Sequence, residues 1–109
     1  MVYSLFCAYN YLSKFKEDIV VCYSDIVFDQ SIFLSLKNKG SYLIVYSEWF
    51  KIWKLRMKSN EIINDAEDLV IKNDKLISIG QKITKKMPKY QYTGIMKFQF
   101  NNFTKLYNY

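Results

Sequence analysis

Asp25 is the residue whose type and position most suggest chemistry. It follows an apolar run in the stretch DIVVCYSDIVFD, residues 18–29. A carboxylate at the end of a strand can cap the turn or helix that comes next. It can also bind a metal ion. The residues alone leave both interpretations of Asp25 open.

The chain contains no histidine, and this narrows the chemistry that it can perform by itself. Ser-His-Asp and Cys-His mechanisms are excluded within the chain. Cys7 and Cys22 lack CxxC spacing and the histidines that would complete a zinc site. We therefore expect reduced, buried thiols. Carboxylate, lysine, tyrosine and metal-assisted chemistry remain.

An aromatic and basic stripe is the second candidate for function. Trp49, Trp53 and Arg56 are spaced i, i+4 and i+7, which places them on one face of a helix. The two tryptophans could form part of an aromatic box for a quaternary ammonium, although core packing is the commoner role of such a stripe. Arg56 could bind a phosphate, but an ion pair with Asp65 or Glu67 is the favoured interpretation.

Composition bounds the class of protein. The 109 residues are 50% hydrophobic and 24% charged, which indicates one small globular domain. The net charge is +6, and the basic residues are spread along the chain. We expect them to lie on a solvated surface, because they lack the clustering of Lys and Arg that is typical of nucleic-acid binding. We expect no membrane-spanning helix and no signal peptide, and hence a cytoplasmic protein.

The elements that must position these residues follow from periodicity. Residues 18–23 read as a fully buried strand, because the apolar run does not alternate. A helix over 30–40, stopped by Gly40, and a strand over 41–46 would complete a βαβ unit with parallel strands. The remaining predictions are a helix over 3–15, a helix from Ser47 to 60, hairpin strands 66–72 and 75–80 joined by Asn73-Asp74, a basic loop 81–91, a strand 92–100, and a final helix after it.

Four segments carry a resemblance to a known family. DIVVCYSDIVFD resembles the strand-plus-aspartate segment of sugar-phosphate and choline-phosphate nucleotidyltransferases. VYSEWFKIWKLRM is similar to their D-x-D/E-W segment, NDAEDLVIKNDKLISIGQK to their DAE segment and hairpin, and YQYTGIMKF to their G-Q/E-Y-x-G strand. The segments come in the family's order over residues 2–100, and the choline-phosphate cytidylyltransferase-like branch is most similar.

The resemblance implies a fold, a reaction and a set of site residues. The fold would be α/β, a Rossmann-like mixed sheet of the nucleotidyltransferase type. The reaction would transfer a nucleoside monophosphate, CMP in this branch, from an NTP to phosphocholine or a sugar phosphate, with release of pyrophosphate. Asp25 would be the catalytic carboxylate that binds Mg²⁺. The implied substrate contacts are Tyr23, Trp49, Trp53, Glu67 and Tyr92, and the implied phosphate contacts are Lys82 and Arg56.

Gly94 is a further position where the sequence indicates a contact. Gly94 lies within a predicted strand, which indicates close approach by another backbone or a ligand.

Several positions depart from the family's pattern. Ser24 and Tyr46 replace a glycine and an aspartate of that pattern. Neither the family's Gly-rich nucleotide-binding segment nor its second metal-binding aspartate is found within residues 1–109.

These departures predict an incomplete domain. We expect a partial nucleotidyltransferase domain that is inactive and self-associating by itself. The alternative is a non-catalytic domain that uses a basic surface to bind an acidic partner.

Overall fold

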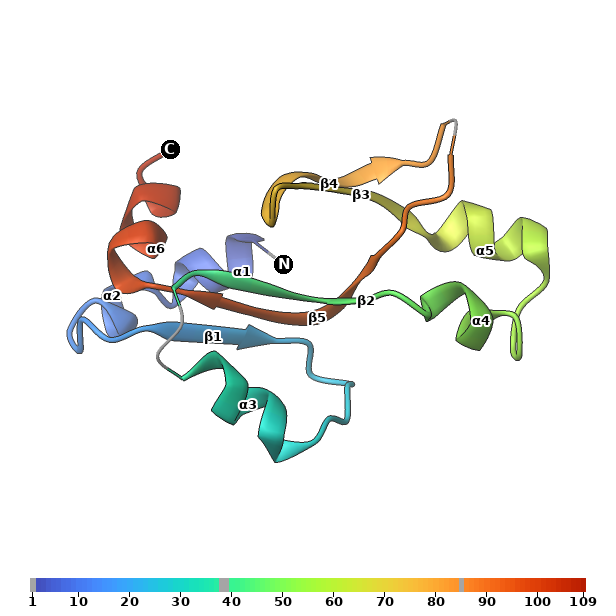
Figure 1. The fold of residues 1–109 in the computed structure, drawn as a ribbon. Helices are drawn as coiled ribbons and strands as arrows, with labels where there is room; N and C mark the ends of the chain where they lie inside the picture. Colours follow the sequence, from blue (N-terminus) through green and yellow to red (C-terminus); the bar gives the residue numbers. More distant parts are fainter. Residues whose placement is uncertain (1, 38–39, 85) are drawn as a thin grey trace. The chain divides into compact units, whose positions relative to one another are not determined.

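The computed structural model describes residues 2–37, 40–84 and 86–109 (Figure 1). Helices and strands are interspersed along these residues, which fits the predicted mixed α/β class. In chain order they are α1 (Val2–Cys7), α2 (Tyr9–Leu12), β1 (Ile19–Cys22), α3 (Gln30–Leu36), β2 (Tyr42–Tyr46), α4 (Trp49–Trp53), α5 (Ser59–Asp65), β3 (Glu67–Lys72), β4 (Lys75–Lys82), β5 (Gln91–Phe98) and α6 (Phe100–Tyr107).

The described strands form two sheets. One has the order β1-β5-β2, and the other pairs β3 with β4. β1 and β5 are antiparallel, with Ile19 opposite Phe98 and Cys22 opposite Ile95. β5 lies between β1 and β2, so the two strands of the predicted βαβ unit do not pair with each other, and their parallel direction stays a prediction. A strand contributed from much later in the chain leaves no trace in the local pattern of residues 18–46.

The chain divides into two compact units, and β2 and β5 contribute residues to both. The first unit comprises the described residues up to Leu43 together with Gly94–Tyr109, and the second comprises Ile44–Thr93. Every helix among the described residues is too short or too polar to cross a membrane.

The first unit buries a charged side chain at its centre. Lys97 on β5 is 7% exposed, and such a charge is stable only with a partner. Its Nζ lies 2.9 Å from an Asp18 carboxylate oxygen and donates to the Leu36 carbonyl at 3.0 Å. The hydrogen bond from Lys97 lowers the pKa of the Asp18 carboxyl. Lys97 thus ties β5 to the end of α3.

Aromatic packing holds the helices of the first unit together. Tyr9 and Tyr107 stack with ring centroids 3.7 Å apart, and Phe6 lies 6.5 Å from the fully buried Phe103. The predicted helix over 3–15 is interrupted at Ala8 and ends at Leu12. Cys7 is exposed, so the expectation of a buried thiol is wrong there.

Other boundaries in the first unit also differ from the predictions. In β1 only Ile19 is buried, and Val20 is 37% exposed, so the strand is not covered on both faces. α3 ends at Leu36, before Gly40, so glycine is not the stop signal. The predicted final turn of this helix, at 38–39, lies outside the described residues.

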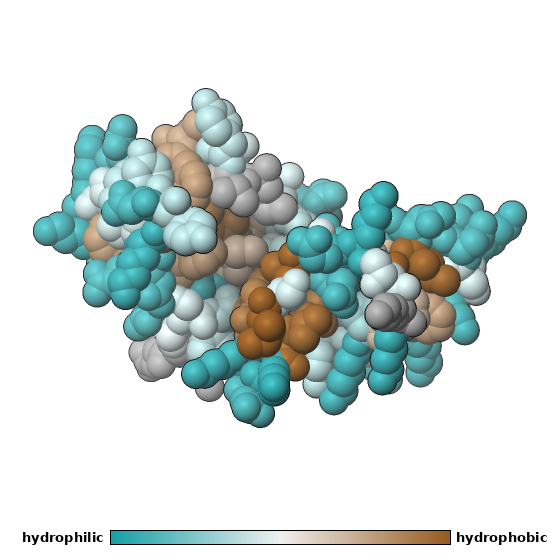
Figure 2. Space-filling model, turned by 90° about the horizontal axis from the view of Figure 1, so that it is seen from above, coloured by the Kyte–Doolittle hydropathy of each residue, from teal (hydrophilic) through white to brown (hydrophobic). Residues whose placement is uncertain are grey.

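The second unit is built on α4, α5 and a hairpin. Trp49, Ile62 and Ala66 form a buried cluster in it, and Leu69 on the hairpin is also buried. Glu48, not Ser47, is the N-cap of α4. Figure 2 shows an apolar patch near the centre of its view, and on the hairpin Val70, Leu76 and Ile77 are 39%, 44% and 61% exposed.

Candidate functional site

Asp25 lies in the turn that directly follows β1, and its side chain is exposed. It does not cap α3. Asp29 has that role, because its carboxylate accepts a hydrogen bond from the Ser31 N–H at 2.8 Å, which lowers the pKa of Asp29. Sequence reasoning missed Asp29, although an aspartate immediately before a helical run is a recognised start signal. With capping assigned to Asp29, the Asp25 carboxylate is left facing solvent.

Asp25 offers a single carboxylate as a possible ligand for Mg²⁺. Nowhere in the described part of the chain do three or more Asp, Glu, Cys or His side chains gather as a metal cage. Mg²⁺ rarely uses such a cage and is usually bound by one or two carboxylates with phosphates and water. A single exposed carboxylate is therefore sufficient for an ion that a nucleotide brings with it.

Tyr23 and Gly94 fix the start of the turn that carries Asp25. The Tyr23 N–H donates to the Gly94 carbonyl at 2.9 Å and so extends the β1–β5 ladder. Gly94 has φ 90°, and a Cβ there would lie 2.6 Å from Cδ2 of the Tyr23 ring. Close approach occurs at this glycine, but the approaching group is the Tyr23 side chain and not the predicted backbone or ligand.

The tryptophan stripe lies in the second unit. Trp49 and Trp53 pack edge to face at 5.3 Å, which confirms their predicted shared face. Trp49 is 2% exposed and donates its indole N–H to the Pro88 carbonyl at 3.2 Å. This supports the packing interpretation for Trp49. Contact with a substrate stays a prediction for both residues.

Arg56 lies beyond α4, which ends at Trp53, so the predicted helical stripe does not reach it. Its guanidinium lies 5.8 Å from the centre of the Trp53 ring. Among the described residues, an ion pair joins Asp18 to Lys97. Neither Asp65 nor Glu67 forms an ion pair with Arg56 there. The favoured ion pair is therefore wrong, because the planar guanidinium lies against an aromatic ring. Phosphate binding by Arg56 stays a prediction.

Glu67 and Lys82 face each other across the β3–β4 hairpin, at the end remote from its turn. Both side chains are exposed, and Tyr92 on β5 is half-buried. Of the predicted basic loop, Gln81 and Lys82 belong to β4, and Lys85 lies outside the described residues. The candidate residues thus divide between the units, with Tyr23 and Asp25 in the first and the others in the second.

A comparison with known proteins gives one informative match. The chain is 32% identical over 106 residues to the CTP:phosphoglutamine cytidylyltransferase of Campylobacter jejuni. The sequence of this chain is therefore cytidylyltransferase-like. The similarity covers 92% of this chain and 41% of the relative, so the chain spans less than half of that enzyme's length. No protein-family model matches the chain, and no solved structure does.

The match bears directly on the resemblance found in the four sequence segments. Those segments indicated the choline-phosphate cytidylyltransferase-like branch of the nucleotidyltransferases. The similarity to a CTP:phosphoglutamine cytidylyltransferase confirms the cytidylyltransferase-like character, and choline phosphate as the acceptor stays a prediction. The mixed α/β elements fit such a relative, while the described pairing of β1 with β5 and of β3 with β4 is antiparallel.

Proposed function

We propose that this chain contributes to cytidylyl transfer from CTP to a phosphorylated small molecule. The observation that carries the proposal is the cytidylyltransferase-like sequence over 92% of the chain. The relative's name gives phosphoglutamine as its acceptor, and phosphocholine or a sugar phosphate are alternatives of the same class. A Rossmann-like nucleotidyltransferase domain and a cytoplasmic location belong to the same proposal.

The reaction requires little covalent chemistry from the protein. An oxygen of the acceptor's phosphate bonds to the α-phosphorus of CTP, while the bond from that phosphorus to the oxygen leading to the β-phosphate breaks. CMP is thereby transferred and pyrophosphate leaves. Such steps are accelerated mainly by positioning and by neutralising phosphate charge.

Asp25 has the central role in this proposal. Its carboxylate follows β1 directly, and it is exposed where a nucleotide could bring a cation. A bound Mg²⁺ would supply charge neutralisation on the phosphates. The chain's own contribution is to hold Asp25 in its turn, through the Tyr23–Gly94 hydrogen bond and ring contact.

The remaining candidate residues have proposed roles in the second unit. Lys82 and Arg56 are cations that could contact phosphates. Trp53, half-buried beside the core, is more accessible to a substrate than Trp49. Glu67 and Tyr92 complete the proposed substrate contacts. All of these assignments rest on the sequence resemblance.

The test is CTP binding by the chain with and without Mg²⁺, measured by isothermal titration calorimetry. We expect binding that needs Mg²⁺ and that Asp25→Asn weakens by about tenfold or more, because the substitution removes the anionic ligand and keeps the shape. Glu17→Gln removes the same charge from an exposed side chain and serves as the control. Equal CTP affinity in the chain and in Asp25→Asn, or no binding with Mg²⁺, would overturn the role of Asp25.

A further inference from the structure

Lys97 is a buried cation on the central strand of a sheet, which is a costly place for a charge. It lies on β5 opposite Val20 of β1, and 7% of its surface is exposed. Taking an ammonium group out of water costs free energy that an ion pair seldom returns in full. Such a pair is weak evidence for stability, and what distinguishes Lys97 is the pair of groups that its ammonium joins.

The ammonium of Lys97 joins the two ends of one segment of the chain. Asp18, whose carboxylate oxygen lies 2.9 Å from Nζ, immediately precedes β1. Leu36, whose carbonyl accepts from the same nitrogen at 3.0 Å, is the last residue of α3. Residues 18–36 thus run out along β1, turn, and return along α3 to the atom from which they started (Figure 1).

Asp25 lies in the turn of this segment. Before it, the Tyr23 main chain is hydrogen-bonded to β5. After it, Asp29 caps α3, which ties the turn to the helix and not to the sheet. The end of that helix is in turn held on β5 by Lys97. The position of Asp25 relative to β5 therefore depends on Tyr23 on one side and on Lys97 on the other.

α3 has little apolar packing of its own to hold it in place. Of its seven residues, Leu36 alone is buried. Phe33 and Leu34 are 42% and 63% exposed. A helix that buries so little apolar surface gains little free energy from packing, so polar contacts at its ends take a larger share. The hydrogen bond from Lys97 is such a contact, and it is made to the one residue that α3 buries.

We propose that Lys97 is a positioning residue for Asp25. Its ammonium holds the start of β1 and the end of α3 on β5, and the turn between them then presents the Asp25 carboxylate in one place. The inference rests on the proposed function, in which Asp25 binds the Mg²⁺ that accompanies CTP. It adds a residue that the sequence resemblance does not include.

Lys97→Met is the first test, because methionine fills a similar volume and lacks the ammonium. The backbone NMR order parameters of residues 24–28 should fall from the range of rigid backbone, about 0.85, toward that of flexible backbone, about 0.6. The affinity for CTP with Mg²⁺ should fall about tenfold. Order parameters that are equal in the two chains, or already low in the parent chain, would overturn the proposal.

Phe103→Leu is the control for a general loss of stability. Phe103 is fully buried in the same unit and packs on Phe6, Tyr9 and Phe98, outside residues 18–36. The substitution should lower the midpoint of urea unfolding by opening a cavity, and leave the order parameters of residues 24–28 unchanged. If Phe103→Leu loosens this turn as much as Lys97→Met, Lys97 is merely structural.

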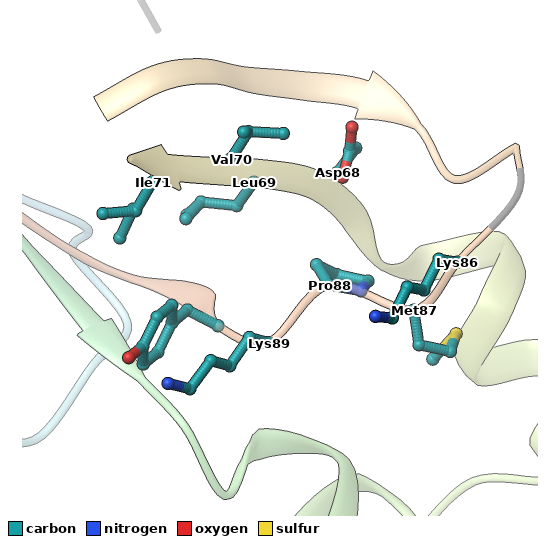
Figure 3. Close-up of a pocket in the computed structure, with 9 residues that line it drawn as sticks. Asp68, Leu69, Val70, Ile71, Lys86, Met87, Pro88 and Lys89 are labelled. Carbon is teal, nitrogen blue, oxygen red and sulfur yellow. The ribbon is translucent and has the colours of Figure 1, made fainter. Parts of the chain in front are cut away.

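Lys89→Met is the control for the loss of one positive charge. Lys89 is exposed and belongs to the second unit, where it lines a cavity of ≈ 550 Å³ with Met87 and Pro88 (Figure 3). Its order parameters at residues 24–28 and its CTP affinity should equal those of the parent chain. If Lys89→Met weakens CTP binding as much as Lys97→Met, net charge sets the affinity and the role of Lys97 in nucleotide binding is refuted.

Asp18→Ala opens the same contact from an exposed position and keeps the buried lysine. The Asp18 side chain is 45% exposed, so this variant should fold even where Lys97→Met does not. Its carboxylate also accepts a hydrogen bond from the Phe100 main chain, so the double variant Lys97→Met/Asp18→Ala is needed. The turn should be no looser in the double variant than in Lys97→Met, and additive loosening would contradict action through Lys97.

The order parameters are measured without nucleotide, so they decide the role of Lys97 independently of CTP. Absence of CTP binding by the parent chain would count against the proposed function alone.

Discussion

At the scale of single residues, Gly94 is the position where the structure predicts the largest loss of stability on substitution. Its φ of 90° is unfavourable for any residue with a Cβ, and that Cβ would overlap the Tyr23 ring at 2.6 Å. Gly94→Ala should therefore lower the free energy of unfolding by about 3 kcal/mol, combining backbone strain with overpacking. Urea denaturation followed by circular dichroism measures this loss.

Gly40→Ala is the matched control for Gly94→Ala. A Cβ at position 40 would meet Gln99 Oε1 at 3.8 Å, which is ordinary contact. The double variant Gly94→Ala/Tyr23→Ala should lose less stability than the sum of its single variants, because the ring that obstructs the new methyl group is gone. If Gly94→Ala unfolds at the urea concentration of the parent chain, the packing of Tyr23 on Gly94 is refuted.

Residue-scale prediction succeeded where a single residue type has few possible roles. A glycine inside a strand pattern indicated close approach, and Tyr23 provides it. Asp25 had two possible roles, and the sequence could not choose between them. Asp29 takes the cap of α3 through its hydrogen bond to Ser31, which is visible only once the start of α3 is known, and metal binding by Asp25 stays a prediction.

At the scale of elements, Trp49 joins α4 to the segment that precedes β5. Its indole N–H donates to the Pro88 carbonyl, and its ring lies in the core with Ile62 and Ala66. Trp49→Phe should lower the free energy of unfolding by about 1–3 kcal/mol, since a half-buried carbonyl loses its donor and the buried ring loses volume. Thermal denaturation of the variant measures the effect.

Trp53→Phe is the control for this substitution. Trp53 is half-buried beside the same core, so its replacement should cost about 1 kcal/mol or less. A Trp49→Phe chain with unchanged stability but weaker binding of phosphocholine would reverse the assignment and place Trp49 in a substrate site.

Elements were predictable where the signal is local. The positive φ values at Asn73 and Asp74 match the hairpin predicted from those two residues, and the strand before it begins within one residue of its predicted start. Helix ends were less predictable, as α3 stops before Gly40 and α4 begins after Glu48. The insertion of β5 between β1 and β2 was not predictable, because it depends on pairing between distant parts of the chain.

At the scale of the whole molecule, exposed apolar surface favours self-association and the net charge opposes it. Large apolar side chains are exposed in both units, and the most exposed include Val27 at 101%, Leu55 at 85% and Tyr109 at 110%. The net charge of +6 repels a second copy. Self-association, predicted from the sequence, should therefore depend on how strongly salt screens that repulsion.

Sedimentation velocity at increasing protein and salt concentrations tests the balance. The Debye length falls from about 10 Å at 0.1 M salt to about 3 Å at 1 M, so repulsion weakens while apolar attraction persists. We expect the average mass to rise with both concentrations. Val27→Ser/Leu55→Ser should reduce the association, whereas Asn10→Ser at an exposed position, which changes neither net charge nor apolar surface, should not. A monomer of constant mass at every salt and protein concentration would contradict self-association, and the exposed residues would then be ordinary solvated surface.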